Sequence, residues 1–560
     1  MIKACKNCSE NFEITPDDIA FYKKVSPVFS GKTYLIPNPT FCPDCRQQRR
    51  LSWRNERSLH HRTCDATGKK IISMYDDQQK FPVYDNDFWW SDKWDPLKYG
   101  VSFDFSQNFF SQFQILFNTV PNRSLVVSYS TMENSDFTNH STSLKNCYLI
   151  TDSINDEDCY FGTTAWGCSN VLDFYNTKDC SYCYEVINCE NCMDVCFSEN
   201  SKSCSNSWFL KNCISCSDCF GCHNLNNKQY YIFNKKYSKY NYEKMMKSLE
   251  KASYSSLKNI KKSVPTKNMQ DVVLYLTGKN NSEVSGDFLN NCKNAQNCFT
   301  SSNLEDCKNC YSIFYAKDCH DYNAWGQKSE QIYECEAIGE SAYNILFCNK
   351  SWSNIANLMY STDCFSSKNC FGCVGLKNAE YCIFNKQYTK EEYEKLVPKI
   401  IEHMQKTGEW GEFFPSKISP FAYNETVAQE YFPLTKSEII EKGLKYKEEK
   451  SSQDYMGPKV EIPDDIKDVD ESICQKILQC EISGKLYKIT LQELKFYKKM
   501  NIPIPRKCPD QRHKERMSLR NPRKLFERKC DNCEIAISTT YAPERLEKVF
   551  CEKCYLESVY

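Results

Sequence analysis

Two groups of four cysteines have the spacing of metal ligands. Each group consists of two Cys-x-x-Cys pairs, and the groups lie at opposite ends of the chain: Cys5, Cys8, Cys42 and Cys45, and Cys530, Cys533, Cys551 and Cys554. Four thiolates surround Zn²⁺ as a closed tetrahedron and leave no coordination position for water or substrate. The sequence therefore predicts about two zinc ions per chain, both structural rather than catalytic.

A third group keeps only two of its four cysteines. It belongs to a segment that repeats the N-terminal module, with Phe496-Tyr497 where the first copy has Phe21-Tyr22. Serine and glutamine replace two ligands in this copy, whose four positions are Cys480, Ser483, Cys508 and Gln511. Cys474 or His513 could complete a cage, but their spacing does not require it. Zinc binding by this second treble clef is left open.

Residues 64–89 repeat the C-terminal cysteine group without most of its ligands. This segment lies 466 residues before the C-terminal copy and aligns with it without a gap. The four ligand positions hold Cys64, Thr67, Asp85 and Phe88, and a phenylalanine cannot bind a metal. We therefore expect a ribbon that is held together by packing, with three tryptophans in its core: Trp89, Trp90 and Trp94.

Capping residues predict the helices of the first module. Thr15 is a good N-cap, Pro16 suits the first helical position, and two acids follow at the positive end of the helix dipole. A second helix is expected from Cys45 to about Glu56, with Pro43 near its start.

Arginines recur along this second helix and along its copy. The two sets are Arg46, Arg50, Arg54 and Arg57, and Arg512, Arg516, Arg520 and Arg523. In a continuous helix this spacing places each set on one face, and a basic helix face suits the phosphates of RNA or DNA. The same arginines could instead contact a protein partner or pair with acids of neighbouring domains. The sequence leaves these interpretations open.

The first module resembles a family of small bacterial zinc-ribbon or treble-clef fingers. Their pattern is CxxC, a helix that ends in Phe-Tyr, and CPxCRxxR. In this chain it reads Cys5-Lys-Asn-Cys8, Phe21-Tyr22 and Cys42-Pro-Asp-Cys45-Arg46. The resemblance covers residues 5–46, recurs at the C-terminal end, and implies zinc binding but no reaction. The whole chain also resembles cysteine-rich proteins of small-genome bacteria, which implies nothing about mechanism.

The middle of the chain is a duplication. Residues 147–244 and 298–395 match at a constant offset of 151 residues without a gap. Cysteines of the first copy recur at 21 residues, as in Cys147, Cys168 and Cys189, between short runs rich in Asn, Asp, Ser and aromatic residues. A repeat of this length without helical periodicity is typical of a β-solenoid. We expect a right-handed solenoid with three short sides and three turns per coil.

Most mid-chain cysteines are expected to fill the solenoid core. Cysteine is small and apolar, so equivalent residues can stack from coil to coil. Several pairs have Cys-x-x-Cys form and could instead bind metal clusters. However, the second copy places other residues opposite three cysteines of the first: Gln331, Glu334 and Glu340. A core position tolerates such a replacement better than a ligand position does. The coil register around residues 325–360 is not determined.

The expected fold class is mainly β and multi-domain, with short helical inserts. An amphipathic helix is expected over 103–118, and inserted helices over 239–262 and 390–406. The expected domains are 1–62 (treble clef), 63–120 (ribbon-like module and amphipathic helix), 121–236 (first solenoid half), 237–283 (helical insert), 284–386 (second solenoid half), 387–446 (helical insert), 447–472 (linker), 473–527 (degenerate treble clef) and 528–560 (zinc ribbon).

Bulk composition excludes little. Lys and Arg together number 72, as do Asp and Glu, so net charge indicates neither a nucleic-acid nor a membrane partner. No long apolar run or signal-peptide core appears, which favours the cytoplasm and reduced thiols. A secreted scaffold held by disulfides is the alternative.

The sequence favours a binding or scaffold protein that contacts a macromolecular partner through its arginine-rich zinc modules. RNA or DNA binding is the first alternative. The second is a solenoid enzyme that acts on carbohydrate through acids of one face: Asp152, Asp156, Asp158 and Asp173. No phosphate-binding loop or nucleophile–base motif is present, so an enzyme is not expected. Partner identity and oligomeric state are not determined.

Overall fold

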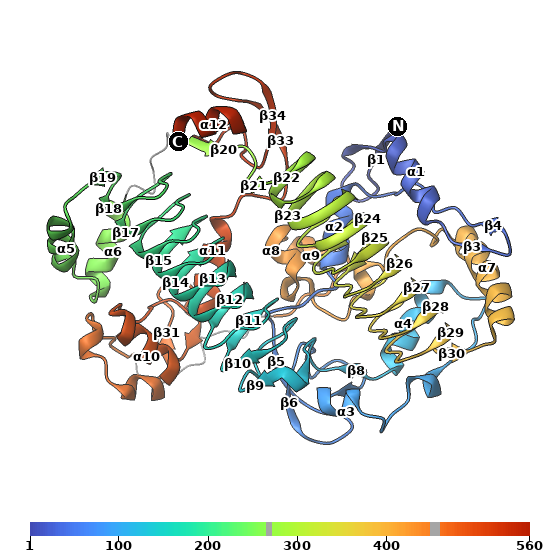
Figure 1. The fold of residues 1–560 in the computed structure, drawn as a ribbon. Helices are drawn as coiled ribbons and strands as arrows, with labels where there is room; N and C mark the ends of the chain where they lie inside the picture. The colour runs from blue at the N-terminus through green and yellow to red at the C-terminus, as the bar shows by residue number, and fades with distance from the viewer. Residues whose placement is uncertain (265–271, 449–459, 560) are drawn as a thin grey trace.

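The computed structural model describes residues 1–264, 272–448 and 460–559, and two β-solenoids form its centre (Figure 1). The first contains β11 (Tyr148–Thr151), β12 (Tyr160–Trp166), β13 (Ser169–Lys178), β14 (Ser181–Ile187), β15 (Met193–Glu199), β16 (Ser205–Trp208), β17 (Ser217–Phe220), β18 (Gln229–Ile232) and β19 (Lys235–Lys236). The second contains β21 (Gly278–Lys279), β22 (Ser282–Asn290), β23 (Lys293–Lys308), β24 (Phe314–Asn323), β25 (Ser329–Glu336), β26 (Tyr343–Leu346), β27 (Ala356–Met359), β28 (Lys368–Phe371), β29 (Glu380–Ile383) and β30 (Lys386–Gln387). The mainly β fold with a duplicated solenoid is confirmed.

Each coil of the first solenoid has 12 residues, so the coil expected from the 21-residue spacing is wrong. Tyr148 pairs with Tyr160, Tyr160 with Leu172, and Leu172 with Tyr184. Every third residue has a left-handed backbone, as at Asn170, Asp173, Asn176 and Asp179. A coil therefore has four sides of three residues rather than three longer sides. Asparagine and aspartate suit these corners because their short side chains bond to nearby backbone and tolerate this conformation.

The inward residue of each triplet forms the solenoid core, and most mid-chain cysteines occupy it. Spacings of 12 and 21 residues are both multiples of three, so cysteines at either spacing face inward, but on different sides of the coil. Cys196 is an exception in the first solenoid, because it lies in an outward row beside Tyr184 and Trp208. All 36 cysteines are free thiols. The prediction of a thiol-filled core is confirmed.

Inward cysteines and serines also satisfy the polar backbone. The thiol of Cys192 donates to the carbonyls of Glu190 at 3.4 Å and Ser201 at 3.5 Å. The hydroxyl of Ser201 in turn accepts the N–H of Cys213, one coil further on, at 3.4 Å. Buried backbone groups need such partners. Small side chains that both donate and accept therefore suit this core better than alanine does.

The second solenoid is irregular where the sequence left the register open. Its register advances by 13 residues in three coils, from Ala316 to Ser329, from Glu330 to Tyr343, and from Tyr343 to Ala356. Each of these coils therefore has one residue more than a coil of four triplets. The constant sequence offset between the two copies consequently does not preserve which residues face inward here.

The three replacements read as changed core positions are not core positions. Gln331 and Glu334 lie at left-handed corners, and Glu340 is exposed. The extra residues have shifted them out of the inward row. Glu334 is nevertheless buried, because the first module covers it.

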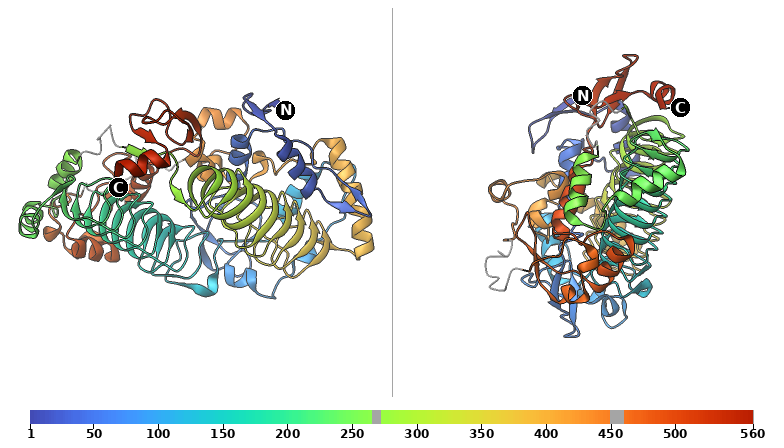
Figure 2. Two further views of the ribbon diagram at one scale, coloured as in Figure 1. Left: turned by 45° about the horizontal axis from the view of Figure 1, so that its top comes forward. Right: turned by 90° about the vertical axis from the view of Figure 1, so that its left-hand side faces the viewer.

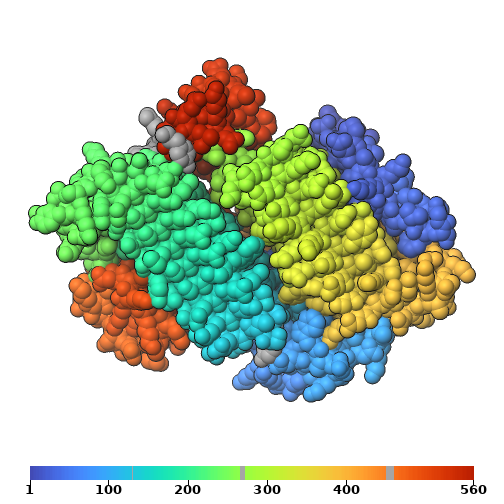
Figure 3. Space-filling view, in the orientation of Figure 1, coloured from blue at the N-terminus to red at the C-terminus, as the bar shows by residue number. Residues whose placement is uncertain are grey.

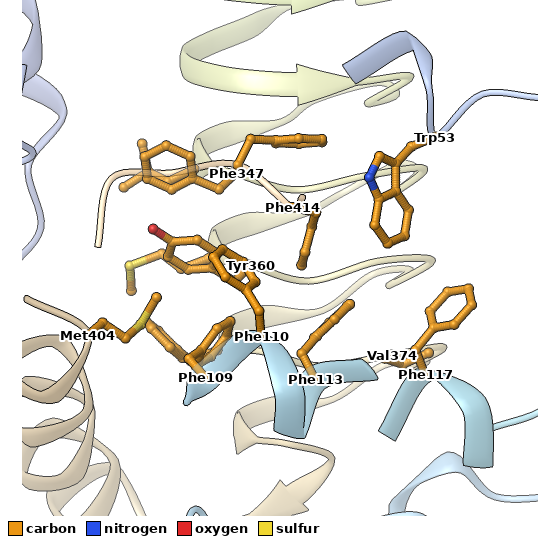
Figure 4. Close-up of a cluster of buried hydrophobic side chains, with 14 of the residues drawn as sticks. Trp53, Phe109, Phe110, Phe113, Phe117, Phe347, Tyr360, Val374, Met404 and Phe414 are labelled. Atoms are coloured by element: carbon orange, nitrogen blue, oxygen red, sulfur yellow. The ribbon is translucent and has the colours of Figure 1, made fainter. Parts of the chain in front are cut away.

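One outward row on each solenoid is apolar and is covered by other parts of the chain. In the first solenoid it contains Tyr160, Leu172, Tyr184, Cys196, Trp208, Phe220 and Ile232. In the second it contains Tyr333, Leu346, Met359, Phe371 and Ile383. The helix α4 (Phe109–Thr119) covers part of the second row, and Figure 4 shows Phe109 and Phe113 of α4 beside Tyr360 and Phe414. The buried face of α4 is the predicted one, although the helix begins later than expected.

The helical inserts close the last coils. The helices are α5 (Lys239–Ser248), α6 (Tyr254–Ser263) and α7 (Lys390–Thr407), and Ser238 and Thr389 cap α5 and α7. α5 packs on β18 and α7 on β29, where the chain also folds back as antiparallel pairs. Such covers protect sheet edges from pairing with other chains. Within the described ranges, no helix has both the length and the apolar character needed to cross a bilayer.

Part of the segment expected as a linker is packed. Residues 449–459 lie outside the described residues. After them, two 3₁₀ helices, η6 (Ile466–Asp468) and η7 (Glu471–Gln475), bury Ile466, Val469 and Ile473 against the second treble clef. Residues 466–475 therefore belong to that module rather than to a linker.

The two treble clefs pack crosswise onto the solenoids. In the N-terminal one, α2 (Pro43–Leu51) contacts β24 and β25 of the second solenoid. In the C-terminal one, α11 (Pro509–Ser518) contacts β12 and β13 of the first. The solenoids lie side by side (Figures 2 and 3) and touch at Trp166 and Phe314, whose ring centroids are 4.3 Å apart. Each end of the chain thus stabilises the solenoid half that is more distant in sequence.

Candidate metal centres and arginine contacts

The first cysteine cage lies between a hairpin and a helix. β1 (Ile2–Ala4) and β2 (Asn11–Glu13) flank Cys5 and Cys8, whereas Cys42 is the N-cap of α2 and Cys45 lies in its first turn. The four sulfurs lie within 4.8 Å of one another. The sequence prediction brought together the right four residues.

Hydrogen bonds around this cage favour thiolates. The backbone N–H of Cys42 donates to Cys5 Sγ at 3.2 Å, and the side-chain amide of Asn7 donates to Cys45 Sγ at 3.2 Å. Hydrogen bonding among the thiols, above all with Cys45, lowers the pKa of Cys42 to about 5. Asn7 lies inside the first Cys-x-x-Cys pair, and its role was not evident from the cysteine spacing.

The second cage lies in the C-terminal ribbon. This module consists of β33 (Phe526–Lys529), β34 (Ala536–Thr539), β35 (Lys548–Phe550) and α12 (Glu552–Val559). The sulfurs of Cys530, Cys533, Cys551 and Cys554 again lie within 4.8 Å of one another. The N–H of Cys551 donates to Cys530 Sγ at 3.3 Å.

Both cages fit a tetrahedral metal. Zn–S bonds of about 2.3 Å require sulfur–sulfur separations of about 3.8 Å. The structure gives 3.7 Å between Cys8 Sγ and Cys42 Sγ, and 3.7 Å between Cys533 Sγ and Cys551 Sγ. Across the described residues, only these two groups bring together three or more potential ligands at such distances. The thiols of the solenoid core therefore form no comparable cage there.

The second treble clef does not complete a third cage. Ser483 Oγ lies 3.5 Å from Cys508 Sγ, near Cys480. His513 Nε2 is instead 3.0 Å from the carboxylate of Glu430. Cys474 belongs to η7 and packs against the module core. Neither residue joins a four-ligand group in the described part of the chain.

Hydrogen bonds replace the metal in the N-terminal ribbon. The thiol of Cys64 and the hydroxyl of Thr67 both donate to Asp85 Oδ2, each at 3.1 Å. The N–H of Asp85 donates back to Cys64 Sγ at 3.2 Å. Trp89 is fully buried, whereas Trp90 remains 39% exposed. Packing therefore holds this ribbon, as expected, and Asp85 links positions that bind metal in the C-terminal copy.

The arginine-bearing helices are shorter than expected. α2 ends at Leu51 and α11 at Ser518. The second half of each arginine set therefore lies in the segment after the helix: Arg54 and Arg57, and Arg520 and Arg523. The arginines do not form a continuous basic helix face.

Three of the four N-terminal arginines are buried against the second solenoid. Arg46, Arg50 and Arg54 are each at most 3% exposed. Their nearest contacts are Arg46 with Asp321 at 2.8 Å, Arg50 with Asn323 at 2.7 Å, and Arg54 with Glu336 at 2.9 Å. Arg49, which the spacing did not single out, contacts Glu334 at 2.9 Å. These guanidinium groups are occupied by acids and amides of the same chain.

The C-terminal copy uses one carboxylate for two arginines. Arg512 and Arg516 contact Asp173 of the first solenoid at 2.9 Å and 2.6 Å, and all three side chains are buried. Burial opposes ionisation of Asp173, but the two guanidinium groups hold its pKa below the usual value. Arg516 also donates to the carbonyl of Phe161 at 2.7 Å. This triad joins the second treble clef to the solenoid.

The remaining three arginines have weaker or different contacts. Arg57 approaches Asp510 only to 3.7 Å. Arg520 and Arg523 are partly exposed and have no ion pair with any described residue. Arg520 donates to the hydroxyl of Tyr431 at 2.6 Å, and Arg523 stacks over the ring of Tyr431 at 4.1 Å. The eight arginines of the two sets are thus not equivalent.

The Phe-Tyr pair shared by both treble clefs is a docking contact. Phe21 stacks on His320 at 3.6 Å, and Tyr22 packs on Tyr333 at 5.2 Å. In the other copy, Tyr497 packs on Tyr184 at 5.8 Å. The retention of Phe-Tyr in a copy that has lost two cysteines indicated a role other than metal binding. The partner residues on the solenoids had no such signal.

Three of the four acids considered for carbohydrate chemistry have structural contacts. Asp173 and Asp152 bind arginines. Asp156 points into the solenoid core, where its Oδ1 accepts the N–H of Cys168 at 2.7 Å, and burial raises its pKa to about 9. These side chains do not converge on a common cleft.

Comparisons with known proteins assign no family. No family model matches the chain, and no curated protein matches it. A solved structure titled "putative acetyltransferase" from Desulfovibrio desulfuricans G20 is similar at 12% identity, with a TM-score of 0.11. That match covers 41% of this chain and 63% of the other. At this level of similarity it supports no conclusion about activity.

Proposed function

We propose that the protein is a structural-zinc scaffold for a protein partner. Zn²⁺ is the expected occupant of both cages, because four thiolates in a closed tetrahedron are its usual structural site. The observation that carries the proposal is the crosswise docking of the treble clefs through buried ion pairs such as Arg516 with Asp173. Zinc then fixes the shape of the first treble clef and of the C-terminal ribbon, and both hold the paired solenoids as one rigid body.

Charge favours a protein partner over RNA or DNA. Acidic and basic residues balance at 72 each, and five of the eight stripe arginines are buried in contacts within the chain. A nucleic-acid surface instead needs exposed cations without acid partners. The free thiols of all cysteines fit a reducing compartment, and we place the protein in the cytoplasm on that ground.

Metal removal tests the zinc part of this proposal. A strong chelator is expected to increase hydrogen exchange in residues 1–60 and 526–559 and to leave the solenoid coils protected. Cys45→Ser should reproduce the change in the N-terminal module, whereas the buried core variant Cys192→Ser should retain the full metal content. Unchanged exchange after complete metal loss would contradict a structural role.

Reconstitution tests the scaffold part. Proteins that co-purify with the tagged full-length chain from its native cells are identified, expressed, and mixed with the purified chain. A complex of fixed stoichiometry that resists high salt supports the proposal. Recovery of RNA as the stable component, or of no stoichiometric component, argues against it.

A further inference from the structure

Two adjacent cavities lie where four parts of the chain meet. Their volumes are about 80 Å³ and 40 Å³. They share five lining residues: Tyr175 of the first solenoid, Thr300 of the second, Tyr431 of α8 (Val427–Tyr431), and Arg520 and Arg523 after α11. Figure 1 places α8 and α11 between and behind the two solenoids. No element of the scaffold proposal uses these cavities.

The two arginines on this wall lack the acid partners of the others. Arg512 and Arg516, in the same segment, share the carboxylate of Asp173 at 2.9 Å and 2.6 Å. Arg520 and Arg523 have only aromatic and hydroxyl contacts among the described residues. A guanidinium held on aromatic rings keeps its planar donors available for an anion.

The other charged groups of the larger cavity mostly neutralise one another. Arg545 donates to Glu547 at 3.0 Å. Asp287 accepts the hydroxyl of Thr540 at 2.8 Å. Lys211 faces Glu199 in the next coil, and burial raises the pKa of Glu199. The charges left over are those of Arg520 and Arg523.

This excess positive charge acts on a neighbouring phenol. Burial opposes ionisation of Tyr175, yet the charges of Arg520 and Arg523 hold its pKa below the usual value. The wall therefore has a positive potential that a bound anion can neutralise.

We propose that these cavities bind the phosphate group of a small molecule. Two guanidinium groups provide the planar donors that phosphate oxygens prefer, and the hydroxyls of Thr300 and Tyr431 lie on the same wall. The volumes accommodate a phosphate-sized group but not a nucleic-acid strand. This narrows the binding role expected for Arg520 and Arg523 to a phosphate compound, and it is independent of the zinc scaffold.

Calorimetric titration of the zinc-loaded full-length chain tests this proposal. The probes are inorganic phosphate, ribose 5-phosphate and a single-stranded RNA oligonucleotide. The variants are Arg523→Gln and the double variant Arg520→Gln/Arg523→Gln. Arg528→Gln serves as the matched control, because Arg528 pairs with Asp531 at 3.2 Å outside these cavities.

We expect saturable binding of phosphate or ribose 5-phosphate, weakened roughly tenfold or more by Arg523→Gln, since a charge-assisted hydrogen bond is lost. Tighter binding of ribose 5-phosphate identifies a phosphoester as the ligand, and equal binding identifies free phosphate. Zinc content and the exchange protection of α11 show whether each variant remains folded, and Arg523→Lys should retain part of the affinity.

Three results overturn the proposal. The first is no saturable binding of either small probe. The second is equal weakening by the control variant. The third is RNA binding that is tighter than that of both small probes and is lost in the double variant, because the site then belongs to a nucleic acid. None of these results affects the zinc prediction.

Discussion

Replacement of Asp173 by asparagine should release the second treble clef from the first solenoid. Asp173 is fully buried and is the shared acid partner of Arg512 and Arg516. Asparagine keeps the shape and one acceptor but removes the charge. Two buried guanidinium groups are then left uncompensated, although each retains a carbonyl contact, with Lys507 and Phe161 respectively.

The expected cost follows from the burial of this triad. Removing one partner of a buried ion pair costs about 3–5 kcal/mol. We expect the lower part of this range because of the retained carbonyl contacts. Since each 1.4 kcal/mol is a factor of ten in an equilibrium, opening of the module should become about 100-fold more frequent.

Native-state hydrogen exchange measures this opening locally. A single unfolding midpoint is less suitable, because a chain with several modules need not unfold in one step. The amides of α11 should exchange about 100-fold faster in Asp173→Asn, whereas those of α2 on the other solenoid should not change. Asp194→Asn is the control, because Asp194 also lies at a left-handed corner of the first solenoid but has no ion pair with a described residue.

Two results would refute this reasoning. One is exchange in α11 that stays within about threefold of the wild-type rate, which corresponds to less than about 1 kcal/mol. The other is an equal increase in Asp194→Asn, because the effect would then come from the corner and not from the buried triad.

Three further perturbations test other parts of the structure. Asp156→Asn should stabilise the chain increasingly as pH rises: burial raises the pKa of Asp156 from 3.8 to about 9, so the folded state holds a proton that the unfolded state releases, and wild-type stability is lost across this range. Between pH 5 and pH 8 the advantage of Asp156→Asn should grow by up to about 4 kcal/mol in denaturant titrations, and a constant difference would refute it. Replacing Thr67, Asp85 and Phe88 together by cysteine should create a third cage in the N-terminal ribbon, seen as one additional zinc ion per chain; no gain would show that this ribbon does not have the geometry of its copy. Cys192→Ser should cost on the order of 1 kcal/mol without loss of metal, because serine can donate to the same carbonyls, and a loss of metal would make Cys192 a ligand.

The metal cages and helix caps were readable from the sequence because their physical causes are local. Two Cys-x-x-Cys pairs define a tetrahedral site almost independently of the rest of the fold. Thr15 and Thr389 cap their helices through side chains three residues away, and this spacing is visible in the sequence. The apolar face of α4 was likewise visible in its helical periodicity.

The coil length was not readable from the cysteines because they mark only part of the core. Inward positions also hold Val171, Phe174 and Ser198, so cysteine spacings combine steps of 12 with steps of 9 or 21. The left-handed corners are the better signal. Asparagine or aspartate recurs at multiples of three, as in Asn170, Asp173 and Asn176, and this recurrence defines the triplet unit.

The roles of the arginines depended on long-range contacts. Arg46 and Asp321 are 275 residues apart, and no local pattern links them. The 13-residue coils that place Glu334 at a buried corner are also invisible in the constant sequence offset. The sequence therefore left intramolecular pairing open beside partner binding, and the structure uses it for the arginines that lie within the helices.

Metal analysis of the natively purified chain tests the central claim most directly. The claim is that eight cysteines in two end cages bind zinc and that the thiols of the solenoid core do not. Elemental analysis should give about two zinc ions per chain and no stoichiometric iron. A markedly higher metal content, or the colour of an iron–sulfur cluster, would show that the solenoid thiols are ligands and would contradict the account.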